Sequence, residues 1–281
     1  MSTRLILLGT AGGPAPKLYR SAPSQVIVTA SGNAYVIDCG NGVARQMVRA
    51  GIDFNTLAGV FVTHHHSDHT ADYGNLLWLA WAANLSRPVP VYGPPPLSFM
   101  TEKFLEMNAL DIETRVVDEG RPPLRPLIQT HEIIAPGVVY VDDDVRVTMA
   151  RVNHPPLANA YAYRFDTHDR AVVISGDTTY SPALIQLARG ADVLVHEVLY
   201  LPAIEQIIAR TNGDSALRQH LLNSHTPVEQ VGRIAQQAGV GTLVLSHFVP
   251  STPDVSDDVW HELAAQGFTG QVIVGHDLMT I

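Results

Sequence analysis

The stretch His64-His65-His66-Ser67-Asp68-His69 decides how this sequence is interpreted. In an extended loop His64 and His66 point the same way and can bind one metal ion, while His65 points away. Asp68 and His69 lie where the chain turns towards a helix and can face a second ion. A borderline ion such as Zn²⁺ accepts imidazole and carboxylate ligands together. The alternative is an accidental histidine run, such as a surface patch or a purification tag. Tags stand at chain termini, whereas this run interrupts an internal strand-to-helix junction, so its position and spacing predict a metal site.

Other residues of ligand type also follow short apolar runs, each predicted to be a strand. The runs and the residues after them are Gly59–Thr63 before His64, Val145–Val152 before His154, Ala171–Ser175 before Asp177, Val193–Val195 before His196-Glu197, and Leu243–Ser246 before His247. Open α/β sheets hold their sites at the carboxyl ends of strands. These groups can therefore converge if the five strands share one sheet system.

Between these strands the pattern alternates with helices. Gln25–Ala30 and Ala34–Asp38 flank a Ser-Gly-Asn turn and predict a hairpin. Helices are expected at Val43–Ala50, Asp72–Asn84 and Leu97–Asn108, and Pro227–Ala238 follows a Thr-x-x-Glu pattern typical of a capping box. The arrangement favours sheets covered by helices. The proline-rich stretch at about 94–137 is expected to be an insertion that forms part of a substrate pocket or a lid.

Length, composition, net charge and cysteine count limit the remaining classes of fold and function. A length of 281 residues suits one large domain or two small ones, and 46% hydrophobic residues can form a sizeable core. The formal net charge of −9 argues weakly against a protein whose main task is to bind phosphate backbones. One cysteine, Cys39, excludes an internal disulfide. We find neither a signal peptide nor a membrane-spanning stretch, and we expect a cytoplasmic protein that works without a membrane.

The motif resembles the hallmark of the metallo-β-lactamase superfamily. Further landmarks fall in the order of that family, from Gly9 to His247: Asp38-Cys39-Gly40, Asn153-His154, Ser175-Gly176-Asp177, His196-Glu197, His225-Thr226 and Leu245-Ser246-His247. The resemblance implies an α/β fold, a four-layer αββα sandwich of two mixed sheets. It also implies that residues 1–281 form a single domain.

The same resemblance assigns the metal ligands. It implies one zinc ion on His64, His66 and His154, and a second on Asp68, His69 and His247, with Asp177 bridging the two; Mn²⁺ or Fe²⁺ could substitute. A hydroxide held between the ions would attack the substrate. A redox di-iron relative would carry glutamate in place of His66, so that residue favours zinc and hydrolysis. A non-catalytic metal-binding scaffold remains a second alternative.

Within the superfamily the chain is most similar to the ribonuclease Z and arylsulfatase-like branch. That branch implies a dyad of Glu197 and His225 beside the metals, with His225 protonating the leaving group. Asp68 would orient the nucleophile or accept its proton. Tyr180 stands three residues after the bridging aspartate, as in the acyl-homoserine lactonases of the superfamily, and is a candidate contact to a substrate carbonyl.

Three departures from ribonuclease Z shape the expected substrate. Only 22 residues separate His154 from Asp177, too few for its tRNA-gripping arm; Asn41 and Val43 replace its usual Glu and Thr; and the chain has two lysines. We therefore expect a small, partly apolar ester, sulfate ester, phosphodiester or lactone, and no nucleic-acid partner. Processing of tRNA 3′ ends is the alternative. A homodimer is compatible with the sequence, and Trp78 and Trp81 could face the pocket, the core or such an interface.

Overall fold

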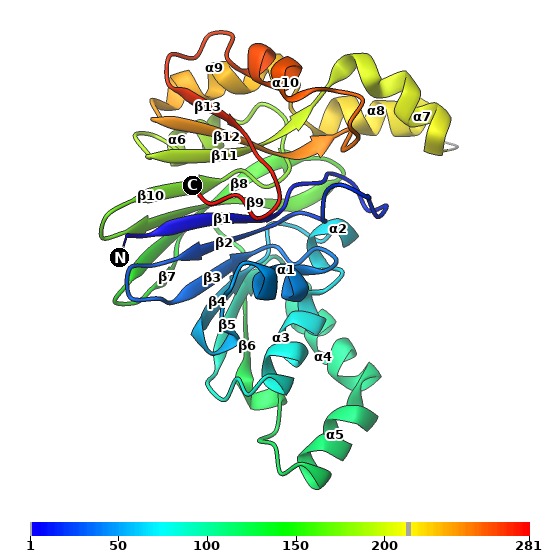
Figure 1. Cartoon of the computed structure of the whole chain (residues 1–281), viewed down its shortest axis with the longest axis vertical. Helices are drawn as coiled ribbons and strands as arrows, with labels where there is room; N and C mark the ends of the chain where they lie inside the picture. Colours follow the sequence, from blue (N-terminus) through cyan, green and yellow to red (C-terminus); the bar gives the residue numbers. More distant parts are fainter. Residues whose placement is uncertain (1, 212–214) are drawn as a thin grey trace.

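Two mixed β-sheets lie face to face with helices on both outer sides (Figure 1). The computed structural model describes residues 2–211 and 215–281. The strand order is β1-β2-β3-β4-β5-β6 in the first sheet and β13-β12-β11-β10-β9-β8-β7 in the second. Each sheet combines antiparallel pairs, such as β1 with β2, and parallel pairs, such as β11 with β12. The predicted αββα sandwich is confirmed.

The elements have the following bounds. The first sheet contains β1 (Arg4–Gly9), β2 (Ser24–Val28), β3 (Ala34–Ile37), β4 (Leu57–Phe61), β5 (Val89–Gly93) and β6 (Ile128–Glu132). The second contains β7 (Gly137–Val141), β8 (Val145–His154), β9 (Leu157–Thr167), β10 (Ala171–Ile174), β11 (Val193–Leu199), β12 (Thr242–Val249) and β13 (Gln271–Val274). The α-helices are α1 (Val43–Arg49), α2 (Ser67–Thr70), α3 (Tyr73–Ala82), α4 (Leu97–Met107), α5 (Ala109–Asp118), α6 (Pro182–Leu187), α7 (Ile204–Thr211), α8 (Ser215–Ser224), α9 (Val228–Ala238) and α10 (Asp257–Ala264).

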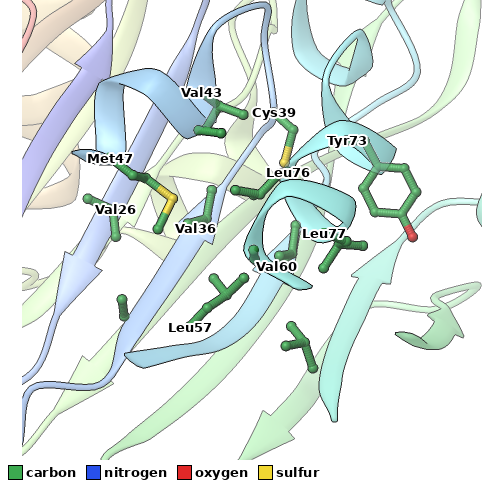
Figure 2. Close-up of a cluster of buried hydrophobic side chains, with 14 of the residues drawn as sticks. Val26, Val36, Cys39, Val43, Met47, Leu57, Val60, Tyr73, Leu76 and Leu77 are labelled. Carbon is green, nitrogen blue, oxygen red and sulfur yellow. The ribbon is translucent and has the colours of Figure 1, made fainter. Parts of the chain in front are cut away.

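Helices α1 and α3 cover the outer face of the first sheet. Figure 2 shows the core between them, where Met47 of α1 and Leu76 of α3 lie over Val36 and Val60 of the sheet. All four side chains are fully buried. Burying each such side chain contributes about 1.5–3 kcal/mol, so this layer holds α3, and the His64 motif before it, against the sheet.

Phe61 occupies the centre of the interface between the two sheets. Its ring centroid lies 5.1 Å from that of Phe165 and 5.6 Å from that of Tyr163, both on β9 of the opposite sheet. On its own sheet it stacks on Tyr92, at 5.3 Å. Aromatic pairs in these geometries add about 0.5–1.5 kcal/mol beyond their burial. Since Phe61 ends β4, two residues before Thr63, this cluster also positions the chain just before the His64 motif.

Helix α9, which packs on the second sheet, forms where the apolar periodicity of the sequence predicts a helix. Its buried residues recur at three- and four-residue spacing, the period of an amphipathic helix: Val228, Val231, Gly232, Ile234, Ala235 and Ala238. The helix ends at Gly239, which takes the left-handed conformation with φ 66°. The predicted end is confirmed, but no side chain caps the start. The hydroxyl of Thr226 instead donates to the carbonyl of Thr178, so the capping-box prediction was wrong.

The segment 94–137 is more regular than its prolines suggest. It forms α4 and α5 and then β6, which pairs with β5 in parallel and completes the first sheet. Trp81 is buried in a cluster with Leu124 and Leu127, and Trp78 packs against that cluster. Both tryptophans therefore belong to a satellite core. Among residues 2–211 and 215–281, no helix has the length and apolar character needed to cross a bilayer.

We expect Phe61→Ala to lower the free energy of unfolding by about 3–5 kcal/mol, because the cavity left between the sheets cannot collapse. Chemical denaturation measures the loss. Phe99→Ala is the matched control, since that ring is 60% exposed on α4, and its effect should stay within about 0.5 kcal/mol. Equal losses in the two variants would contradict the central role of Phe61.

Candidate metal centre and catalytic cavity

Asp38 organises the loop that carries the His64 motif. It follows β3 with φ 60°, a left-handed conformation that is uncommon outside glycine. Its carboxylate accepts hydrogen bonds from the backbone N–H of Thr63 at 2.8 Å and from the Thr63 hydroxyl at 2.9 Å. It also accepts a bond from Nδ1 of His69, at 2.7 Å. Asp38 therefore fixes both ends of the loop and turns Nε2 of His69 towards the site.

The three histidines that the resemblance assigns to one ion lie together and form the first candidate ligand group. Nδ1 of His66 lies 3.1 Å from Nε2 of His64 and 3.0 Å from Nε2 of His154. Oδ2 of Asp177 lies 3.7 Å from the first Nε2 and 3.9 Å from the second. A tetrahedral ion with metal–nitrogen distances of about 2.0–2.1 Å separates its ligand atoms by roughly 3.3 Å. The distances between the candidate ligand atoms of this group are close to that value.

Asp68, His69 and His247 form the second group. Nε2 of His247 lies 3.4 Å from Oδ2 of Asp68 and 3.2 Å from Oδ2 of Asp177. Nε2 of His69 lies 3.4 Å from Oδ1 of Asp177. Asp177 thus presents one oxygen or the other to both groups, the position expected of a bridging ligand. His65 faces the opposite way, with Nε2 at 2.7 Å from the carbonyl of Pro94.

His247 reaches the site because β12 is irregular there. On β11, Glu197 pairs with Ser246 and Val198 with Phe248, so His247 is the extra residue of a bulge. Its φ is 47°, again in the left-handed region. Opposite it, a Cβ added to Gly12 would come within 2.9 Å of Nδ1 of His247. The bulge and the bare backbone at Gly12 together make room for the imidazole ring.

The residues present fit a pair of divalent ions. Within each group, the candidate ligand atoms all lie within 4.8 Å of one another. Nε2 of His69 and Oδ1 of Asp177 are buried without a hydrogen-bond partner. Buried polar atoms of this kind are costly unless something binds them, and a cation satisfies both. Mixed imidazole and carboxylate donors suit Zn²⁺ or another transition metal better than Mg²⁺ or Ca²⁺.

The electrostatics of the group formed by His64, His66, His154 and Asp177 favour metal binding. Burial and the neighbouring His154 lower the pKa of His66 to about 4, and burial lowers the pKa of His64 and His154. Burial opposes ionisation of Asp177, but His247 and His69 outweigh it and hold its pKa well below the usual value. Neutral imidazoles with an ionised carboxylate are the protonation states that bind metal ions.

Glu197 and His225 form the predicted dyad. Nδ1 of His225 lies 3.3 Å from Oε2 of Glu197, while Oε1 of Glu197 accepts from the backbone N–H of Thr226 at 2.9 Å. Both side chains are buried. Burial opposes protonation of His225, but Glu197 and Asp177 raise its pKa to about 9. The same Nδ1 is 4.0 Å from Oδ2 of Asp177, so the dyad adjoins the metal ligands.

A cavity of about 590 Å³ opens over these groups. Its polar residues include Asp68, Asp177, His225 and His247, and much of its remaining wall is aliphatic, for example Leu217, Leu221 and Val249. Loop 12–17, helices α7 and α8 and the segment 249–252 complete it. Residues 94–137 line none of this cavity, and their role as a lid stays a prediction.

Tyr180 is not part of the site. Its side chain is 47% exposed, and its hydroxyl donates to Oε1 of Gln237 on α9, at 3.0 Å. It is absent from the cavity wall. Its three-residue offset from Asp177 alone was a poor guide, because the chain turns away before α6.

Four residues of the site escaped the sequence analysis. Asp38 and Thr63 hold the motif loop, and Thr63 also lies 3.0 Å from Nδ1 of His64 through its hydroxyl. The carbonyl of Ser224 accepts from Nδ1 of His154 at 2.7 Å. His220 of α8 lines the cavity, with its ring 5.9 Å from that of His225. Asp38 stood within a recognised landmark, whereas α8 carried no such signal.

Comparison with known proteins agrees with this geometry. Residues 33–248 match the family model described as "Beta-lactamase superfamily domain". The chain belongs to the β-lactamase superfamily. It is 35% identical to a ribonuclease Z of Mycobacterium bovis over 277 residues, 98% of this chain and 96% of that one. It is 34% identical to a ribonuclease Z of Mycolicibacterium gilvum over 275 residues, 97% and 93% of the two chains.

The short form of human tRNase Z shares the fold, with a TM-score of 0.72 at 18% identity and coverage of 99% of this chain and 98% of that one. As a member of the superfamily, the protein is a metal-dependent hydrolase. The expectation that nucleic acid is not a partner is wrong, because the curated relatives at about 35% identity are ribonucleases. The match runs over nearly the full length of both chains, and it outweighs the missing arm.

We expect Asp38→Asn to weaken metal binding about 10–100-fold, because a neutral amide orients and polarises His69 less well than a carboxylate. Competition with a chelator measures the affinity. Asp53→Asn provides the control, since that carboxylate is exposed and caps a turn far from the site. Unchanged affinity in Asp38→Asn would show that Thr63 and the backbone alone position His69.

Proposed function

We propose that this hydrolase is an endonuclease of the ribonuclease Z type, which cleaves a phosphodiester bond at the 3′ end of precursor tRNA with two zinc ions. The observation that carries the proposal is the buried Glu197–His225 pair directly beside the metal ligands. The names of the full-length relatives support the same activity.

The dyad matters because of the leaving group. Hydrolysis of an RNA phosphodiester expels a sugar alkoxide, which leaves poorly without a proton. A carboxylate accepts only, so Glu197 requires a proton on Nδ1 of His225. In the protonated ring the other proton is on Nε2, and His225 lines the cavity. His225 is thus placed to protonate the leaving oxygen, and Glu197 orients and charges it.

The remaining residues divide into binding and positioning roles. His64, His66 and His154 would hold one ion, Asp68, His69 and His247 the other, and Asp177 both. Divalent ions bound there activate water and neutralise charge on the phosphate. Asp68 is the proposed orienting group or proton acceptor for the water. The N–H of Gly13 donates to Oδ2 of Asp68 at 3.0 Å and holds that carboxylate in place.

The apolar wall of the cavity supports a second candidate. Leu217, Leu221 and Val249 could receive the hydrophobic part of a small sulfate ester, carboxylic ester or lactone. Such a substrate needs the same metals. It differs from RNA in needing no basic surface outside the cavity, and a substrate panel separates the two candidates.

Incubation with a 3′-extended precursor tRNA tests the main proposal. We expect cleavage at one position near the discriminator base, with a kcat/KM at least about 100-fold above that for small sulfate and carboxylic esters. Elemental analysis of the same preparation should give about two zinc ions per chain. Intact precursor together with rapid turnover of one small ester would contradict the proposal and favour the second candidate.

We expect His225→Ala to lower kcat/KM about 10²–10⁴-fold for substrates with alkyl leaving groups and less than about 10-fold for nitrophenyl phosphodiesters, which leave without a proton. Glu197→Gln should show the same dependence more weakly, since it acts through His225. A series plotted against leaving-group pKa measures the slopes. Metal content should stay at the wild-type value. Parallel slopes would exclude the acid role, and lost metal would make His225 a ligand.

A further inference from the structure

A second depression, here called the α1 groove, lies beside the catalytic cavity. It has a volume of about 290 Å³ and is formed by residues 11–22, in the loop between β1 and β2, and by residues 41–49 around α1. Its lining includes the cations Lys17, Arg20, Arg45 and Arg49 and no acidic side chain. The whole chain has 18 basic and 27 acidic residues. Four cations without one carboxylate are therefore a strong local excess of positive charge.

Three of these cations have neutral partners or face solvent. Arg45 and Arg49 are exposed, and their four-residue spacing puts them on one side of α1. Arg49 donates to the amide oxygen of Gln46 at 2.8 Å, and Lys17 donates to the carbonyl of Ala15 at 2.9 Å. These hydrogen-bond partners carry no charge, and the carboxylate that acts electrostatically on Lys17 is Asp68 of the catalytic cavity.

Arg20 has a structural role instead. It donates to the hydroxyl of Thr10 and to the carbonyl of Gly275, and its guanidinium lies 4.1 Å from the centre of the Phe248 ring. The neighbouring carboxylates are engaged by the backbone. Asp277 accepts from the N–H groups of Thr10 and Ser21, and Asp72 accepts from the N–H of Gly42. Asp257 and Asp277 act electrostatically on Arg20, so the charge that the groove offers to a ligand comes mainly from Lys17, Arg45 and Arg49.

The α1 groove is continuous with the catalytic cavity. Gly13, Pro14, Ala15 and Lys17 line both. In Figure 1 the dark-blue loop that carries them extends to the same side of the molecule as α7 and α8, which form the other wall of the cavity. Tyr19, two residues after Lys17, lines neither depression, but its side chain is 69% exposed on the same loop. A polymer that leaves the cavity over this loop meets Lys17 first and then the arginines of α1.

We propose that the α1 groove binds the phosphodiester backbone of an RNA strand next to the scissile bond. The proposal rests on the proposed function and names the surface that substrate would use. Guanidinium groups bind phosphates through charge-assisted bonds, and an exposed aromatic ring can stack on a base without regard to its identity. Arg45, Arg49 and Lys17 would supply the phosphate contacts and Tyr19 the stacking contact. A chain without the tRNA-gripping arm would thus hold its substrate through this groove.

Binding of a labelled 3′-extended precursor tRNA tests the proposal at several salt concentrations. All proteins carry His225→Ala, which slows cleavage of the RNA by about 10²–10⁴-fold during the measurement. The groove pair Arg45→Ala with Arg49→Ala should raise Kd about 10-fold or more and reduce the slope of log Kd against log salt by about 2, one unit for each lost phosphate contact. The matched pair Arg87→Ala with Arg146→Ala removes two exposed arginines before β5 and at the start of β8, and it should leave both values unchanged.

Two further measurements separate binding from chemistry. With His225 intact, the groove pair should hydrolyse bis(p-nitrophenyl) phosphate with unchanged kcat/KM, because that substrate fits within the cavity. Tyr19→Ala should weaken RNA binding about 5-fold or more, and Tyr19→Phe should not, since a phenyl ring stacks equally well.

The outcomes distinguish the two proposals. Equal affinity in the groove pair and the matched pair would overturn the α1 groove, even if wild-type protein cleaves the precursor. Binding that depends on the groove, without cleavage by wild-type protein, would support the groove and contradict the proposed function. Absence of any measurable RNA binding would overturn both.

Discussion

The buried carboxylate of Asp38 is the interaction on which the site depends. It stands at the end of β3, yet it bonds to Thr63 at the start of the motif loop and to His69 near its end. Four predicted ligands lie between or at those points. Without this anchor the loop would have to be ordered by the ions alone, at a cost of roughly 1–2 kcal/mol per residue in backbone entropy. The fold supplies that order in advance, because β3 and β4 are neighbours in one sheet.

The sequence predicted well what depends on local pattern and on a fixed motif. Strand and helix positions followed from apolar periodicity, as in α9, and the family motif named the histidine and aspartate side chains that the fold brings together. Prediction from sequence failed where contacts between residues far apart in the chain decide which hydrogen bond a side chain makes. Thr226 had the right neighbours for a helix cap, but Thr178, 48 positions away, takes its hydroxyl. Tyr180 had a suggestive offset, but Gln237 takes its hydroxyl in turn. A short stretch of sequence does not show which distant group will compete for a hydroxyl as its hydrogen-bond partner.

The expectation of no nucleic-acid partner was wrong for a related reason. Net charge and lysine count are averages over the whole chain, whereas recognition of a polyanion depends on where the cations lie. This chain has an acidic total, and still places Lys17, Arg45 and Arg49 along one depression without a carboxylate in its wall. Arginines, which bind phosphate in pairs of hydrogen bonds, supply most of that charge. The net charge of a chain is therefore weaker evidence against a nucleic-acid partner than the positions of its charged side chains.

The bulge at His247 places catalysis and folding stability in opposition. A residue held at φ 47° without glycine's freedom raises the energy of the native backbone by on the order of 1 kcal/mol. Glycine there would relax the chain but bring no imidazole to the site. Selection for activity therefore retains a residue that selection for a firmer fold would discard, a trade-off common at active sites. The fold tolerates this strain because β12 is an interior strand of its sheet, paired with β11 and β13 and buried along nearly its whole length.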